Sequence, residues 1–132
     1  MKVRMFVNGQ AMSGGSISQG LQSATFLGPM KTAPRYRFFS VRDEFPGLHE
    51  DPAKGAAIQG ELYEAEAEVL RDELMPLEPE ELELSIIELE DGSPSLSMRM
   101  RDDRLHDEDV VEITEFGGWH AYLAQLPGGK AV

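Results

Sequence analysis

The chain has 132 residues, of which 41% are hydrophobic and 27% charged, and this size and composition predict one soluble globular domain. It contains no cysteine, which excludes disulfides, thiolate metal sites and cysteine nucleophiles. No apolar run approaches the length of a membrane span, and the N-terminus lacks the apolar core of a signal peptide, so we expect a cytoplasmic protein without membrane contact. The net charge of −12 argues against nucleic acid as a partner.

The charges are unevenly distributed along the chain. Residues 1–42 carry six basic side chains and no acidic one, whereas the remaining residues carry all 24 acidic side chains. The basic third could give an anionic small molecule a locally positive site. Alternatively, its basic strands pair with acidic strands across a sheet, where opposite charges on neighbouring strands are favourable.

The first candidate site is the glycine-rich loop that follows a predicted strand at residues 2–7. Its residues are Asn8, Gly9, Gln10, Ala11, Met12, Ser13, Gly14 and Gly15. Ser16 and Gln19 have the spacing of a capping box, which predicts a helix over residues 16–23. Glycines let backbone N–H groups approach a ligand closely, and a helix N-terminus adds unpaired donors, so the loop is a candidate binding site for a small anion or amide. The alternative is a strand–turn–helix connection without a ligand.

Two further strands are predicted at residues 25–30 and 36–41, joined by a short turn that contains a proline. Arg35 follows that proline, and a guanidinium can hold a carboxylate in bidentate geometry. We expect Arg35 to turn inward and pair with the charge of a bound ligand, whereas Arg37 fits an outward ion-pair face. Residues 43–56 contain two prolines and two glycines and are predicted to form a long loop.

The second half of the chain is predicted to contain four more strands and two helices. The strands are expected at residues 57–63, 82–89, 95–101 and 110–113, and the helices at residues 64–74 and 116–126. Asp91 and Gly92 predict a type I′ hairpin turn. The element order favours an α+β fold, a small mixed β-barrel with flanking helices, in one domain over residues 1–126 with a loose tail at residues 127–132.

Trp119, Tyr122 and Leu123 recur at helical spacing, which predicts the core face of the last helix. We expect no metal and no cofactor, because the three histidines are far apart and share no metal-ligand spacing. Ser13 and Ser16 have no adjacent base, so hydrogen bonding and capping are their predicted roles rather than nucleophilic attack.

Three motifs resemble one known family. They are the loop over residues 8–15, the segment Thr32-Ala33-Pro34-Arg35-Tyr36-Arg37, and the stretch Ile113-Thr114-Glu115-Phe116-Gly117-Gly118-Trp119-His120-Ala121-Tyr122-Leu123-Ala124. Together they are similar to the C-terminal domain of allophanate hydrolase, which belongs to the γ-glutamylcyclotransferase-like fold. The resemblance covers residues 3–124 and implies a small barrel with a cavity near the first loop.

The resemblance also implies a function in urea or amide nitrogen metabolism. In allophanate hydrolase an amidase domain makes an N-carboxylated carbamate, and the C-terminal domain is associated with its decarboxylation. The chain has no room for an amidase domain. The resemblance therefore implies a stand-alone relative that binds a small carboxylated amide or carbamate and works with an amidase or a urea carboxylase.

Departures from the family pattern leave three hypotheses open. Ala11 stands where the enzyme domain carries a histidine, and Asn8 stands where the cyclotransferases carry a tyrosine. The cyclotransferases also use a glutamate after the fourth strand. Four residues match that region, namely Glu73, Glu78, Glu80 and Glu81. The three hypotheses are a decarboxylating enzyme, a non-catalytic binding subunit, and a γ-glutamyl cyclotransferase-like enzyme. The sequence does not single out a catalytic residue.

Overall fold

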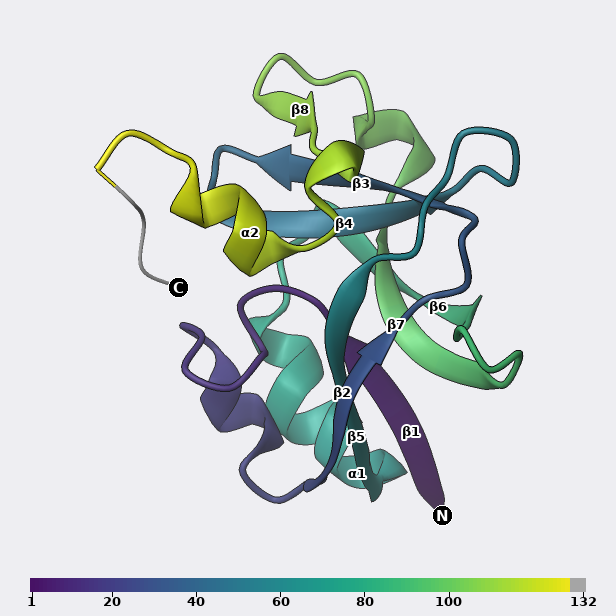
Figure 1. Cartoon of the computed structure of the whole chain (residues 1–132). Coiled ribbons are helices and arrows are strands. Elements are labelled where there is room, and N and C mark those ends of the chain that lie inside the picture. Colours follow the sequence, from purple (N-terminus) through teal and green to yellow (C-terminus); the bar gives the residue numbers. More distant parts are fainter. Residues whose placement is uncertain (129–132) are drawn as a thin grey trace.

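An eight-stranded sheet forms the centre of the chain in the computed structural model, which describes residues 1–128 (Figure 1). Its strands are β1 (Lys2–Val7), β2 (Thr25–Lys31), β3 (Tyr36–Val41), β4 (Phe45–Glu50), β5 (Gln59–Glu66), β6 (Leu82–Glu88), β7 (Pro94–Met100) and β8 (Val110–Glu112). They are hydrogen-bonded in the order β2-β5-β1-β7-β4-β3-β8, and β6 pairs with β7. The predicted tail falls largely on residues 129–132, which lie outside the described residues.

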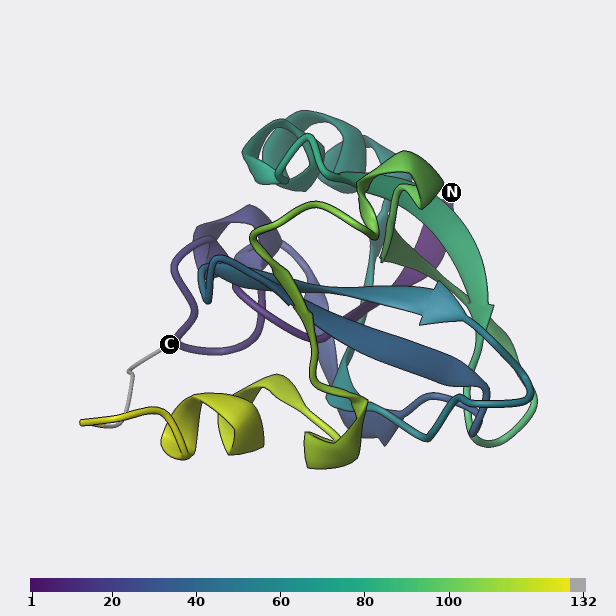
Figure 2. The ribbon, with the colours of Figure 1, turned by 90° about the horizontal axis from the view of Figure 1, so that it is seen from above.

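The sheet curls because β7 changes partner along its length. Leu96 and Ser97 of β7 pair in parallel with β1, whereas Arg99 pairs in parallel with Leu48 of β4. Consequently β3 and β4 run across the direction of β1, β2 and β5 (Figure 1). Viewed from above, the helical segment after β5 and the C-terminal helix lie on opposite sides of this sheet (Figure 2). The predicted α+β class, with a mixed, barrel-like sheet and flanking helices, is confirmed.

The helix predicted for residues 16–23 is reduced to one 3-10 turn, η1 (Ser18–Leu21). The predicted capping box is wrong, because no side chain caps this turn. Backbone bonds replace it: the Ser18 N–H donates to the Gly15 carbonyl, and the Gly20 N–H donates to the Ile17 carbonyl. These short-range bonds wind the chain too tightly for an α-helix.

The other two helical segments also differ from the prediction. Residues 64–66 extend β5, since they pair with β1, and the helical segment then runs through α1 (Ala67–Val69), η2 (Leu70–Leu74) and η3 (Met75–Leu77). At the C-terminus, η5 (Thr114–Phe116) is separated from α2 (Trp119–Ala124) by two glycines. The Thr114 hydroxyl accepts the N–H of Phe38 at 2.9 Å, so it joins β3 to η5.

The prediction of a long loop over residues 43–56 is wrong, because β4 occupies its first half. Pro46 and Gly47 suggested a loop, yet they pair with Ser40 and Phe39 of β3. β7 pairs with β4 only at Leu48, so Pro46 lies where β4 lacks a partner on its second side and a missing N–H is tolerated. Burial of the apolar side chains on both faces of β4 then outweighs the low strand propensity of Pro46 and Gly47.

The hairpin between β6 and β7 is confirmed, but its turn differs from the predicted type I′. The Leu89 N–H donates to the Ser93 carbonyl, so three residues form the loop. Gly92 has a φ of 84°, whereas Asp91 is not among the described residues with positive φ. One left-handed residue at the end of a three-residue loop is the other common hairpin geometry.

The core contains one large cluster inside the curled sheet and a smaller one around Phe39, Phe45 and Met100. Trp119, Tyr122 and Leu123 are buried, which confirms the predicted core face of the last helix. Every helix within residues 1–128 is too short to cross a bilayer.

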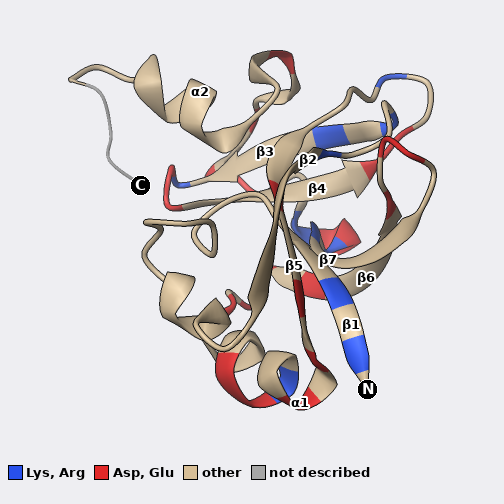
Figure 3. Cartoon of the chain, turned by 60° about the horizontal axis from the view of Figure 1, so that its bottom comes forward, with Lys and Arg blue, Asp and Glu red and all other residues tan. Residues whose placement is uncertain are grey.

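Five of the six basic residues of the first third lie opposite acidic residues or form ion pairs with acidic residues from later in the chain, as in the second of the two alternatives. Lys2 and Arg4 lie opposite Glu66 and Glu64 across β1 and β5 (Figure 3). Three arginines form ion pairs: Arg35 with Glu50 and Glu88, Arg37 with Asp51 and Glu112, and Arg42 with Glu44, Glu81 and Asp109.

We predict that Arg42→Ala destabilises the fold by about 2 kcal/mol, because it leaves the Glu81 carboxylate without its nearest cation. The Glu81 side chain is only 8% exposed, and its other cation, Arg104, is 3.7 Å away. Urea denaturation of the variant checks this. Arg71→Ala removes an exposed ion pair with Asp72 and should cost less than about 1 kcal/mol. Equal losses in the two variants would contradict a special role for the buried carboxylate.

Candidate functional site

The first loop leaves β1 and folds back on itself. The Met12 N–H donates to the Gly9 carbonyl, the Gly15 N–H to the Met12 carbonyl, and the Ile17 N–H to the Gln10 carbonyl. These donors are therefore not available to a ligand. The N–H groups of Gly9, Gln10 and Ala11 have no acceptor within residues 1–128, so the first half of the loop offers its backbone donors.

Glu61 of β5 fastens this loop to the sheet. Its carboxylate accepts the N–H of Ser13 at 2.7 Å, the Ser13 hydroxyl at 3.2 Å and the Tyr63 hydroxyl at 3.1 Å. Burial, followed by the neighbouring Glu61 charge, raises the pKa of Tyr63 despite the opposing effect of the adjacent Ser13 hydroxyl, so the Tyr63 hydroxyl keeps its proton. The role of Ser13 is thus hydrogen bonding within the protein.

We predict that Glu61→Ala loosens the loop and costs about 1–2 kcal/mol, because three donors lose a charged acceptor. Hydrogen exchange of the Ser13 amide should become faster than in the unmodified protein. Glu64→Ala on the same strand is the matched control, since the Glu64 carboxylate forms no hydrogen bond or ion pair within residues 1–128. Unchanged protection at Ser13 in Glu61→Ala would contradict this role for Glu61.

A cavity of about 20 Å³ lies beside the first half of the loop. This is room for about one water-sized group. The cavity is partly open to solvent and is bordered by the end of β1, the loop, the start of β4, the segment before β6, and β7. Its lining residues are Met5, Phe6, Val7, Asn8, Gly9, Gln10, Ala11, Ile17, Phe45, Pro46, Glu78, Leu82, Ser97 and Met98.

Asn8 places an unpaired donor in this lining. The residue is 9% exposed, and its amide nitrogen Nδ2 is buried without a hydrogen-bond partner in the described part of the chain. Leaving a buried amide donor unpaired costs about 1–3 kcal/mol. Such a cost is typical of a group that is satisfied by a ligand or a bound water. Ser97 differs, because its hydroxyl donates to the Phe6 carbonyl at 2.9 Å.

Glu78 supplies the titratable group of the cavity. It follows η3, and its N–H donates to the Met75 carbonyl at 3.1 Å, which ends the helical segment and directs the chain towards β6. The neighbouring cavity walls at Phe45, Pro46 and Leu82 are apolar. Burial in these surroundings raises the pKa of Glu78 from its ordinary value of 4.5 to about 7. A carboxyl group with this pKa can give or take a proton at neutral pH.

The structure separates the predicted binding residues into four groups. Asn8, Gly9, Gln10 and Ala11 line the cavity. Met12 faces a second hollow beneath α2, whereas Ser13, Gly14 and Gly15 complete the turn outside the cavity lining. Arg35 is on another part of the sheet, where its guanidinium Nε lies 2.9 Å from Glu50. The cavity therefore lacks the charge partner that the sequence suggested.

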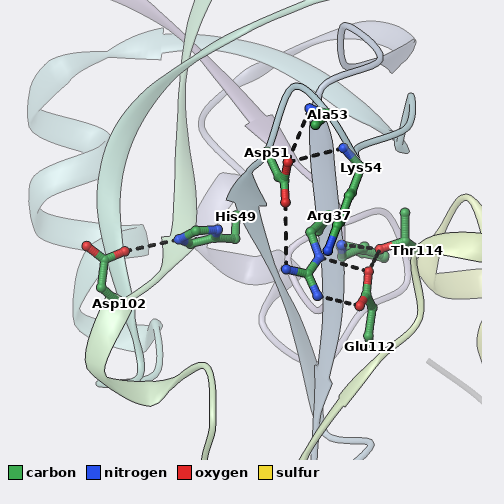
Figure 4. A network of polar contacts seen from close by, with 9 residues as sticks. Arg37, His49, Asp51, Ala53, Lys54, Asp102, Glu112 and Thr114 are labelled. Carbon is green, nitrogen blue, oxygen red and sulfur yellow. Dashed lines mark hydrogen bonds and ion pairs between the residues drawn. The ribbon is translucent and has the colours of Figure 1, made fainter.

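Arg37 lies in a polar network on the outer surface (Figure 4). Its guanidinium donates to both oxygens of Glu112 and lies 3.7 Å from Asp51. The hydrogen bond from Arg37 lowers the pKa of Glu112. This network joins β3 to β8 and to the segment after β4, which agrees with the outward ion-pair face predicted for Arg37. Within residues 1–128 no group of His, Asp or Glu side chains is arranged to hold a metal ion.

Sequence reasoning did not distinguish Glu78 from three other glutamates. Glu73 and Glu80 are exposed, and Glu81 is paired with Arg42. Only Glu78 of these four lines the cavity. A local signal exists in Pro76 and Pro79, which flank Glu78 and turn the chain towards the sheet.

The curled sheet and the loop-side cavity define a γ-glutamylcyclotransferase-like fold. A solved γ-glutamyl cyclotransferase shares this fold with a TM-score of 0.57 and 14% identity, over 76% of this chain and 68% of its own. Residues 3–124 match the allophanate hydrolase C-terminal domain, and the chain belongs to this family.

Three relatives illustrate the range of the family. The urea amidolyase of Saccharomyces cerevisiae is 28% identical over 79% of this chain, which spans only 6% of that protein's length. The allophanate hydrolase of Kluyveromyces lactis has a TM-score of 0.88 and 27% identity, over 96% of this chain and 22% of its own. The uropathogenic Escherichia coli-specific protein c4763 has a TM-score of 0.86 and 27% identity, over 96% of this chain and 99% of its own.

Proposed function

We propose that the cavity binds one end of a small carboxylated amide or carbamate and that Glu78 acts on this ligand as a general acid. The observation that carries this proposal is the buried, unpaired amide nitrogen of Asn8 in the same cavity as a carboxyl group with a pKa of about 7. The Asn8 amide binds an oxygen atom of the ligand, and the Glu78 carboxyl group exchanges a proton with the ligand.

The donors suit the oxygens of a carboxylate or an amide carbonyl. Asn8 Nδ2 has no acceptor within residues 1–128, and the N–H groups of Gly9, Gln10 and Ala11 are likewise unused there. The hydrogen bond from the Ser13 N–H to the Glu61 carboxylate fixes the loop to β5 before a ligand binds. Donors that are already positioned cost little reorganisation when negative charge develops on the ligand.

Decarboxylation of an N-carboxylated carbamate requires one proton and no redox partner. The bond between nitrogen and one carboxylate carbon breaks, and carbon dioxide leaves. The electron pair stays on nitrogen, which takes the proton from the Glu78 carboxyl group, so a carbamate remains. Solvent then returns a proton to the Glu78 carboxylate. The relatives' names, urea amidolyase and allophanate hydrolase, support a place in urea or amide nitrogen use, with an amidase or a urea carboxylase as partner.

The test supplies the N-carboxylated carbamate continuously from allophanate and an amidase, and it measures carbon dioxide release. The unmodified chain should accelerate release, and Glu78→Gln should reduce this acceleration about 10²–10⁴-fold, because a positioned acid is lost. Glu80→Gln, an exposed carboxyl in the same segment, is the matched control and should retain activity. If carbon dioxide is released at the same rate with and without this chain, the catalytic role is overturned. The non-catalytic binding subunit is then the remaining hypothesis.

A γ-glutamyl cyclotransferase-like reaction is the second candidate, because those enzymes use a glutamate in the corresponding region and Glu78 lines the cavity. Asn8 in place of the loop tyrosine weighs against it. Cyclisation of a γ-glutamyl dipeptide, followed by mass spectrometry, separates the two candidates. Rapid cyclisation without carbon dioxide release would favour this second reaction.

A further inference from the structure

The lining of the cavity contains a carboxyl group and no cation. Of its fourteen residues within the described chain, Glu78 has the only ionisable side chain, and no lysine, arginine or histidine is present. The available donors are neutral amides at Asn8 and along residues 9–11. An anion that enters such a site meets a second negative charge whenever Glu78 is ionised.

We propose that the cavity seats a single carboxylate group together with one proton, which is shared between that carboxylate and Glu78, and that it rejects a second negative charge. This inference rests on the proposed function and specifies its substrate as a monoanion. A diacid such as an N-carboxylated carbamate would then be bound with one of its two charges neutralised.

The walls make an unshared second charge costly. Phe6, Phe45 and Leu82 are almost fully buried and offer no polar group from their side chains. Two carboxylates that share such a site cannot both ionise easily, whereas a carboxylic acid and a carboxylate form a strong hydrogen bond.

The charged groups around Glu78 are engaged elsewhere. On its own segment, Glu81 is paired with Arg42 and Arg104, and Glu80 is exposed. At the start of β4, Glu44 is paired with Arg42. On β7, Arg99 is paired with Glu83. The first loop from residue 8 to residue 17 and the cavity-lining part of β1 contain no ionisable side chain. Burial alone therefore accounts for the raised pKa of Glu78.

Formate is the probe for this proposal, because it is the smallest carboxylate, and formamide is its neutral analogue. Amide NMR spectra of the full chain, recorded from about pH 6 to about pH 8.5, report binding through Gly9, Gln10 and Ala11. We expect formate affinity to be constant below the pKa of Glu78 and to fall about tenfold per pH unit above it, because one proton must then be taken up with each formate. Formamide binding should not weaken over this range.

Two variants isolate the group responsible. Glu78→Gln should bind formate with the same affinity at every pH, whereas Glu80→Gln should keep the pH dependence of the unmodified chain. The inference is overturned if the unmodified chain binds formate equally well at low and high pH. It is also overturned if formate affinity still falls with rising pH in Glu78→Gln. In either case the decarboxylation test can still succeed. Absence of formate binding at every pH overturns the binding function and this inference together.

Discussion

Replacement of Glu78 by glutamine is expected to stabilise the fold at about pH 8 by up to about 3 kcal/mol while it removes turnover. Folding raises the pKa of this carboxyl group from 4.5 to about 7, because burial penalises the carboxylate. Between these two pH values the folded state therefore binds more protons than the unfolded state, and the free energy of unfolding decreases as the pH rises through this window. Glutamine is neutral throughout and avoids that loss.

Urea denaturation at about pH 4.5 and about pH 8 measures this effect. Because Glu78 is protonated in the folded state at the lower pH, the variant and the unmodified chain should have similar stabilities there. They should diverge as the pH is raised. Glu80→Gln is the control, because Glu80 is exposed and does not line the cavity. A Glu78→Gln variant that is less stable than the unmodified chain at about pH 8 would contradict a half-buried Glu78 carboxyl group that keeps its proton.

This gain in stability upon loss of a functional group would itself be informative. A residue kept for packing stabilises the fold, whereas a residue kept for chemistry is often held in surroundings that destabilise it. Glu78 and the unpaired amide of Asn8 both carry such a cost in the free protein. A bound ligand would relieve both costs at once, which is why stability should also increase with ligand concentration.

The second large effect is expected at Gly60, where alanine should destabilise the fold by at least about 3 kcal/mol. β5 passes so close to β1 that a Cβ at residue 60 would lie 2.4 Å from the Phe6 ring and 2.4 Å from the Val7 carbonyl oxygen. Phe6 is fully buried, and the Val7 carbonyl belongs to the backbone that leads into the loop. Neither can move without a shift in the cavity wall.

Thermal and urea unfolding of Gly60→Ala check this prediction. Gly14→Ala is the control: a Cβ there meets no atom within 4 Å, and only its φ of 80° is unfavourable, so it should cost about 1 kcal/mol. Because Gly14 lies outside the cavity lining, its substitution should leave ligand binding nearly unchanged. A Gly60→Ala variant with the stability of the unmodified chain would show that β1 and β5 can separate without cost.

Local chemistry along the chain determines much of this protein. Alternating apolar residues predict most of the strands, Asp91 and Gly92 predict the hairpin, and the spacing of Trp119, Tyr122 and Leu123 predicts the buried face of α2. The motifs at residues 8–15, 32–37 and 113–124 indicate the family, which the match over residues 3–124 confirms. These features depend on residues that are close in sequence, so they can be recognised without knowledge of the fold.

Only the tertiary structure decides which residues meet across the sheet. Strand β4 forms despite Pro46 and Gly47 because β3 and β7 bury it, and Arg35 pairs with Glu50 and Glu88 instead of approaching the first loop. Glu78 is distinguished from Glu73, Glu80 and Glu81 because it lines the cavity between the end of β1 and the start of β4, more than thirty residues earlier in the chain. Burial and ion pairing between distant segments are consequences of the curled sheet, and no short window of sequence contains both partners.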